Sequence, residues 1–231
     1  MQALAKCFVY TGVVSYEALI RPDGLGATII RDFANPEEIA AVLAESKNPE
    51  KVDWHDSHDT YENQRGLTIV QNHYSYALKL SAGDQTPFDA IPSTVALCRR
   101  TQRFINSLSP IFPSLADWQP DELSLHLYDD QDVGLSKHRD TLRFTGLIAI
   151  IAIDGTCDLA ITHNDEEIPI LIEPGDLSLL RAPGLIDCDT EVRPEHSVQN
   201  LRTPTRLSMM LRANNRPTEA IKGFHFNNWH P

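Results

Sequence analysis

Between Leu123 and Arg212 the sequence alternates short apolar segments with turn-forming residues, and this pattern restricts the chain to few folds. Pro174-Gly175-Asp176 and Asp154-Gly155 are strong turn signals. Because short strands spaced this closely bury their apolar faces only against one another, we expect a barrel or a two-sheet roll. The segments predicted to be strands are 123–128, 146–153, 158–162, 168–172, 177–181, 196–201 and 206–212.

The part of the chain before residue 121 mixes helix and strand signals. After a short strand over 27–31, a helix is predicted to start at Asn35-Pro36-Glu37-Glu38, where a capping Asn precedes Pro and two acids. A second helix is predicted over 93–108, where apolar residues recur on one face. The polar and aromatic stretch 52–76 between these helices suits a loop or hairpin that covers a pocket.

These signals together predict an α+β fold that is mainly β, with the N-terminal helices bracing a β core. The chain has 231 residues, of which 42% are hydrophobic, so it can bury a sizeable core. No linker interrupts it, and we expect a single domain over 1–231. Within that domain 1–120 would form the helical support and a lid, 121–215 the core, and 216–231 a tail.

The chain is acidic, with 32 Asp and Glu against 20 Lys and Arg and a formal net charge of -12. Such a charge repels phosphate backbones, so nucleic acid is a disfavoured partner, although a local basic patch would still allow it. The four cysteines form no CxxC pair, no secretory signal pattern opens the chain, and no apolar run is long enough to cross a membrane. We therefore expect a reduced, cytoplasmic protein with no membrane partner.

One tripeptide, His138-Arg139-Asp140, has the spacing of two metal ligands. In a strand, residues two apart point to the same side, so His138 and Asp140 would aim at one point. His196, at the start of a later predicted strand, offers a third ligand. Two imidazoles and one carboxylate leave part of an ion's surface open, which suits non-haem Fe(II) with a cosubstrate and O2. The alternative is that these are ordinary surface or capping residues.

A second feature, the segment from Arg206 to Arg212, supports the metal site. Alternation would place Arg206, Ser208 and Arg212 on one side of the predicted strand. A guanidinium facing a barrel interior is strongly desolvated unless it meets an anion, and a carboxylate fits its fork. A dicarboxylate 2-oxo acid could bind the metal at one end and Arg206 at the other. The alternative for Arg206 is a structural ion pair.

The predicted strand before the metal ligands ends in His126-Leu127-Tyr128. His126 and Tyr128 would share one face, and both side chains can donate hydrogen bonds to cosubstrate oxygens. The alternative for Tyr128 is a core aromatic residue with its hydroxyl in water.

In this order, the motifs of the chain resemble those of the Fe(II)/2-oxoglutarate-dependent dioxygenases, and most of all the AlkB-like branch. The motifs that carry the resemblance are His126-x-Tyr128, Gly134, His138-x-Asp140, the Gly175-Asp176 turn, His196 and Arg206-x-Ser208-x-x-x-Arg212. Where that branch has Asn, this chain has His126 and Ser208, which sets it apart from the DNA-repair members.

The resemblance implies a double-stranded β-helix (jelly roll) with helices on its outer side. His138, Asp140 and His196 would hold Fe(II), and Arg206 would bind 2-oxoglutarate with help from Tyr128. His126, Ser208 and Arg212 would complete the cosubstrate site. Because Asp140 is present as a carboxylate ligand, hydroxylation with release of succinate and CO2 is favoured over halogenation.

The substrate is less constrained. Arg139 and Arg143 flank the metal motif and could reach an anionic group, or could serve only as solvent-facing charges. Trp54 and Tyr74 are candidates for a lid over the substrate. Three functions stay open: a hydroxylase of a small molecule such as an amino acid or metabolite, an AlkB-like demethylase of nucleic acid or hydroxylase of protein side chains, and a non-enzymatic jelly-roll binding protein. The acidic charge favours the first.

Overall fold

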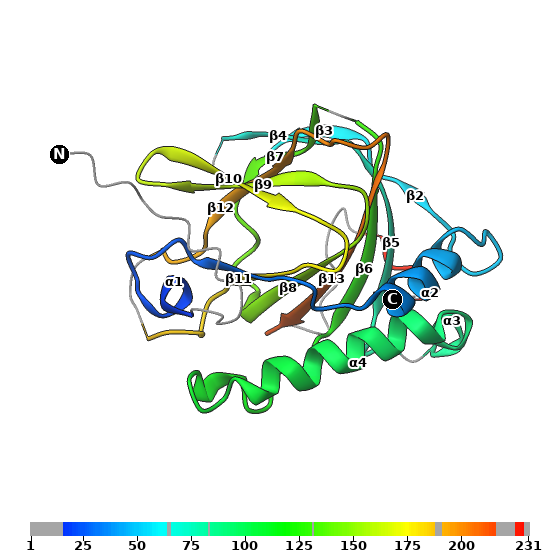
Figure 1. Ribbon diagram of the computed structural model, residues 1–231, viewed down its shortest axis with the longest axis horizontal. Helices are drawn as coiled ribbons and strands as arrows, with labels where there is room; N and C mark the ends of the chain where they lie inside the picture. The colour runs from blue at the N-terminus through cyan, green and yellow to red at the C-terminus, as the bar shows by residue number, and fades with distance from the viewer. Residues whose placement is uncertain are drawn as a thin grey trace.

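The computed structural model describes residues 16–63, 66–82, 84–130, 132–187, 191–215 and 225–228. Their strands form two antiparallel sheets (Figure 1). The major sheet has the order β1-β11-β8-β13-β6-β5-β2 and the minor sheet the order β10-β9-β12-β7-β4-β3. The strands of the major sheet are β1 (Ala27–Ile30), β11 (Leu177–Arg181), β8 (Phe144–Asp154), β13 (Arg206–Asn214), β6 (Glu122–Tyr128), β5 (His73–Lys79) and β2 (His55–Asp56). Those of the minor sheet are β10 (Glu166–Ile172), β9 (Cys157–His163), β12 (Glu195–Gln199), β7 (Val133–His138), β4 (Thr68–Gln71) and β3 (Asp59–Glu62).

The helices cover the outer side of the major sheet, as predicted. Figure 1 shows α4 running beneath that sheet with α2 beside it. The helix-side core joins α4 residues such as Leu97 to β6 residues such as Leu125. Asn35 caps α2 in a capping box with Glu38, which confirms the predicted helix start. The helices are α1 (Glu17–Ile20), α2 (Pro36–Ser46), α3 (Thr86–Ala90), α4 (Pro92–Ser107) and the 3-10 helix η1 (Pro113–Leu115).

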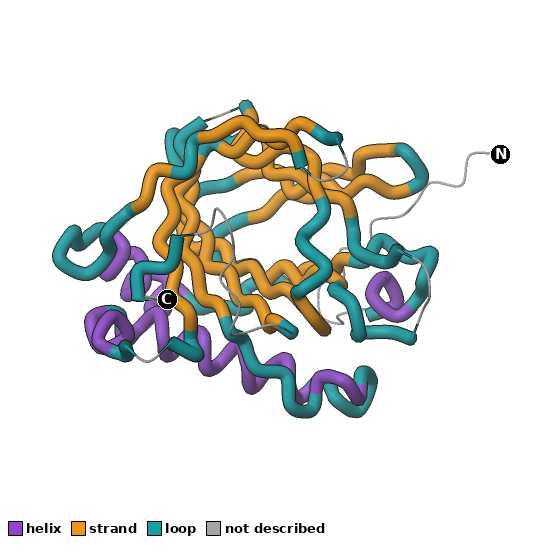
Figure 2. The backbone as a smooth tube through the Cα atoms, turned by 180° about the vertical axis from the view of Figure 1, so that it is seen from behind, coloured by secondary structure: helices purple, strands orange, loops and turns teal. Residues whose placement is uncertain are grey.

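A second core lies between the two sheets. Figure 2 shows the strands surrounding this interior, with the helices on one outer side. Along β13, Leu207 and Met209 belong to the helix-side core, whereas Met210 belongs to the core between the sheets. The alternation predicted for this strand is therefore confirmed, and it directs one face of β13 into the roll.

Every strand predicted between residues 123 and 212 is present, but β7, β5 and the two-residue β2 were missed. β7 was missed because its sequence, Val133–His138, mixes polar and apolar residues. The stretch 52–76 was expected to be a loop or hairpin. It does contain the β3–β4 hairpin, but it ends in β5, whose residues are almost all buried within the major sheet. Its histidine, tyrosines and serine hid this strand because buried strands are normally rich in aliphatic residues.

The C-terminal residues 225–228 pack back on the edge of β5. The Asn227 main chain donates to the carbonyl of Ala77, and its side chain accepts from the Ala77 amide. The Asn228 side chain pairs in a similar way with both main-chain groups of Lys79. Cys98 and Cys157 are buried free thiols, while Cys7 and Cys188 lie outside the described residues. None of the described helices is long and apolar enough to span a bilayer.

Candidate metal centre

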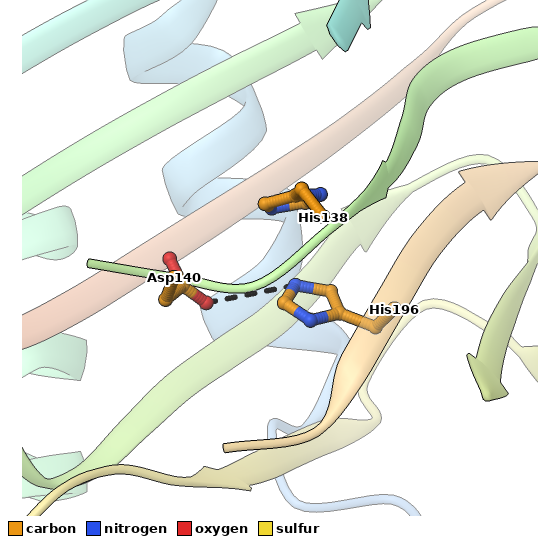
Figure 3. A group of neighbouring side chains, drawn as sticks. All are labelled: His138, Asp140 and His196. Atoms are coloured by element: carbon orange, nitrogen blue, oxygen red, sulfur yellow. Dashed lines mark ion pairs between the residues drawn. The ribbon is translucent and has the colours of Figure 1, made fainter. Parts of the chain in front are cut away.

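His138, Asp140 and His196 converge, as Figure 3 shows. One potential ligand atom from each lies within 4.8 Å of the others. His138 is the last residue of β7 and is paired directly with His196 on β12, so the two rings stand side by side with centroids 4.3 Å apart. Asp140 lies two residues beyond β7, and its Oδ2 is 3.6 Å from His196 Nε2. The sequence pattern therefore predicted a cluster that the fold assembles.

Both imidazoles are oriented by main-chain carbonyls. Nδ1 of His138 donates to the carbonyl of Ser136 at 2.9 Å, and Nδ1 of His196 donates to that of Pro194 at 3.2 Å. In the neutral form of each ring, Nε2 therefore carries no proton, and Nε2 of His196 faces Asp140. A metal-ligating histidine is typically held in this way through its second nitrogen. Burial, with repulsion from His138, lowers the pKa of His196 to about 4, so this ring is neutral near pH 7.

The Asp140 carboxylate is held ionised. Burial alone would raise its pKa, but attraction from His196, Arg212 and His138 outweighs burial and keeps the pKa below its ordinary value. Arg212 Nε lies 3.9 Å from Asp140 Oδ1. Two imidazoles, which bind metal in their neutral form, and one carboxylate are the donor set that non-haem Fe(II) takes. The residues present fit that ion.

A narrow cavity leads from this cluster into the roll. Arg206, on β13, also lines this cavity and is only 3% exposed. Nε and Nη1 of Arg206 have no hydrogen-bond partner within the described part of the chain. Its guanidinium lies 5.1 Å from the centre of the Tyr128 ring. The cavity is lined by Tyr128, Leu135, His138, Asp140, Ile150, Leu159, Ile172, Ser178, His196, Val198, Arg206, Met210 and Arg212.

Tyr128, His126 and Ser208 lie together beside this cavity. Tyr128 lines it, and burial raises the pKa of its phenol, so the hydroxyl stays protonated and able to donate. His126 and Ser208 are paired across β6 and β13, are buried, and do not line the cavity. His126 Nε2 and Ser208 Oγ lack hydrogen-bond partners among the described residues. Of these three side chains, Tyr128 therefore contacts the cavity, while His126 and Ser208 are buried beside it.

The predicted substrate residues are dispersed. Arg139 pairs with Glu195 at 3.1 Å, and Arg143 lies 3.5 Å from Glu122, so both arginines have acidic neighbours. Trp54 packs against the helix-side core and donates to the Ser46 carbonyl at 3.3 Å. Tyr74 lies edge-on to His58, with ring centroids 4.8 Å apart. None of these four predicted residues lines the cavity.

The structure places two further residues beside the site: His73 was predicted only as part of the stretch 52–76 that covers the pocket, and Arg193 was not predicted. His73 is buried and stacks on His126, with ring centroids 4.6 Å apart and planes 10° apart. Burial also lowers the pKa of His73 to about 4. Arg193 is buried and donates to the main-chain carbonyl of Asp140. The polar composition of the stretch 52–76 gave no sign that His73 is buried, and no sequence pattern marked Arg193.

No protein-family model matches the sequence, and no curated protein matches it either. Solved structures do match. A full-length Neurospora crassa protein in complex with alpha-KG superposes with a TM-score of 0.58 at 12% identity, over 83% of this chain and 76% of that chain. A Pseudomonas putida prolyl-4-hydroxylase gives 0.53 at 12% identity, over 83% and 93%. OsALKBH1 gives 0.51 at 12% identity, over 81% and 98%.

These likenesses confirm the fold: the chain has the jelly-roll architecture that its motifs predicted. The matched structures include prolyl hydroxylases and an AlkB homologue. At such low identity the likeness concerns the backbone, and the chemistry of this chain has to be argued from its own site.

Proposed function

We propose that this protein is an Fe(II)- and 2-oxoglutarate-dependent dioxygenase that hydroxylates a small molecule. The observation that carries the proposal is the pairing of two features in one cavity. The metal-ligand cluster lines the cavity, and so does the buried Arg206, whose guanidinium has two nitrogens that lack hydrogen-bond partners among the described residues. A buried cation without a partner is costly unless an anion binds it.

In this proposal His138, Asp140 and His196 hold the ion. The Nδ1 atoms of the two histidines are bonded to main-chain carbonyls, which keeps the Nε2 of each imidazole turned toward the ion. Iron with 2-oxoglutarate and O2 supplies the oxidation of a substrate C–H bond, with succinate and CO2 as coproducts. Arg206 binds the distal carboxylate of the cosubstrate through its fork, and Tyr128 donates to the same carboxylate. Apolar side chains that line the cavity, including Ile150 and Val198, exclude water.

A small-molecule substrate is favoured by the charge of the chain. The net charge of -12 opposes binding of a phosphate backbone. The matched structures include prolyl hydroxylases and an AlkB homologue, so they favour no single substrate class. Arg139 and Arg143 are the basic side chains that flank the metal motif in sequence and remain our candidates for an anionic substrate group, with Trp54 and Tyr74 as more distant candidates.

The test is succinate release from 2-oxoglutarate by the Fe(II)-loaded protein, screened with amino acids, other small metabolites, peptides and methylated oligonucleotides. We expect an amino acid or metabolite to stimulate succinate release, and His138→Ala to abolish it. Stimulation by an oligonucleotide or peptide alone would reassign the substrate class. Absence of Fe(II) uptake would leave only the interpretation that the chain is a non-enzymatic binding protein.

A further inference from the structure

The main chain of Asp140 lies outside the β-ladder, so the hydrogen bonds of the ladder do not fix it. β7 ends at His138, and Asp140 belongs to the loop that precedes β8. A residue inside a strand is fixed by hydrogen bonds on its main chain, but a loop residue needs another partner. For Asp140 that partner is a side chain: Arg193 Nη1 donates to the Asp140 carbonyl.

Arg193 is itself fixed before it reaches Asp140. Its guanidinium is buried, and Glu191, two residues earlier, grips it in a fork: Nε donates to Oε1 at 2.8 Å and Nη2 donates to Oε2. The Arg193 amide also donates to Glu191 Oε1, at 3.1 Å. This pairing offsets the desolvation of the guanidinium and leaves Nη1 aimed outward from the pair.

The same loop orients the third ligand. Pro194, the next residue, supplies the carbonyl that accepts from His196 Nδ1. The segment 191–196 therefore both holds the His196 ring and holds the main chain of Asp140. His196 Nε2 and Asp140 Oδ2, 3.6 Å apart, thus belong to two residues that this segment contacts.

We propose that Arg193 is a positioning residue that fixes Asp140 relative to His196 and so sets the affinity of the site for its metal. This inference rests on the proposed function, because it assumes that the cluster binds a divalent cation. Lysine cannot replace Arg193, because an ammonium cannot keep the two-point grip of Glu191 and reach the Asp140 carbonyl as well.

The direction of the change in metal affinity distinguishes a positioning role of Arg193 from a simple electrostatic effect of its charge. Removal of a positive charge near a cation site should strengthen cation binding by Coulomb's law alone. Loss of a residue that orients a ligand should weaken it, by about 10- to 100-fold for such outer partners. Arg193→Met therefore gives opposite results under the two explanations.

The experiment is titration of the purified full chain with Co(II), followed by the visible absorption of the bound ion, for Arg193→Met, Arg193→Lys and Glu191→Gln. Arg202→Met is the matched control, since Arg202 is an exposed arginine that pairs with Asp158 at 3.0 Å. We expect weaker Co(II) binding and an altered spectrum for both Arg193 variants, a smaller loss for Glu191→Gln, and no change for Arg202→Met. Thermal unfolding without metal checks that each variant folds. If Arg193→Met does not fold, the Co(II) affinity of Glu191→Gln decides.

Two negative results have different meanings. If wild type binds Co(II) and the folded Arg193 variants bind it with the same affinity and spectrum, or more tightly, the role of Arg193 is refuted and the proposed function stands. If wild type binds no Co(II), the proposed function fails and this inference fails with it.

Discussion

Arg206 and Tyr128 are paired across β13 and β6, and the Arg206 guanidinium lies 5.1 Å from the centre of the Tyr128 ring. The aromatic ring stabilises the cation without using its N–H groups, which remain able to bind an anion. This pair thus gives the wall of the cavity a fixed positive charge.

Arg206→Met should weaken 2-oxoglutarate binding. Charge-assisted hydrogen bonds are each worth about 1.5–3 kcal/mol, so we expect roughly a 10- to 100-fold rise in the KM for 2-oxoglutarate. Metal affinity should change little, because Arg206 is not one of the three residues of the metal-ligand cluster. Arg202→Met removes the same charge from the surface and is the control. An unchanged KM in Arg206→Met would show that another group binds the distal carboxylate.

Gly134 gives the Tyr128 ring its space. A Cβ at Gly134 would lie 2.7 Å from Tyr128 Cδ1, so Gly134→Ala should displace the ring and lower the free energy of unfolding by about 1–3 kcal/mol. Combined with Tyr128→Leu, which removes the ring, the substitution should cost much less than it does alone. Denaturant unfolding of the two single variants and the double variant measures this coupling, and strict additivity would contradict the contact.

His58 ties the start of the β3 hairpin to the turn after β6. Its two ring nitrogens lie 2.7 Å from Asp56 and 2.7 Å from Asp129, and hydrogen bonds to Asp129 and Asp56 raise its pKa. A raised folded-state pKa stabilises the fold fully below the unfolded value near 6.5, and the contribution is lost as the pH rises through the folded pKa.

His58→Gln should therefore lower the melting temperature at about pH 5.5 and have less effect at about pH 8.5. Asp129→Asn removes the largest cause of the shift and should reproduce this pH dependence. Thermal unfolding at the two pH values is the measurement. Equal destabilisation by His58→Gln at both values would mean that the charge of His58 is not involved.

The pKa of His73 is shifted in the opposite direction to that of His58. Burial lowers its pKa to about 4, so the unfolded chain takes up a proton near pH 6.5 before the folded chain does. Stability is then lost as the pH falls from that value toward about 4. His73→Phe keeps a ring against His126 and removes the titration, so it should show a smaller loss of melting temperature between about pH 7 and pH 5. The same loss as in wild type would contradict a neutral buried imidazole at this position.

The sequence predicted the jelly-roll half of the chain well because turn residues separate strands whose apolar periodicity is clear. It also predicted the metal cluster, since the spacing of His138 and Asp140 marks two ligands and His196 begins a later predicted strand. It did not reveal β5 or the inward position of His73, because a buried strand rich in histidine, serine and tyrosine reads as a polar loop. Nor could it place Arg193, because a side chain that bonds a distant main-chain carbonyl has no periodic signature.

Metal-dependent binding of 2-oxoglutarate, measured by calorimetry on the full chain without oxygen, tests the central claim most directly. We expect wild type to bind 2-oxoglutarate only when Fe(II) is present, Arg206→Met to bind it far more weakly, and His138→Ala to lose the dependence on metal. Binding of 2-oxoglutarate that is equally strong with and without Fe(II), or absent under both conditions, would contradict the account.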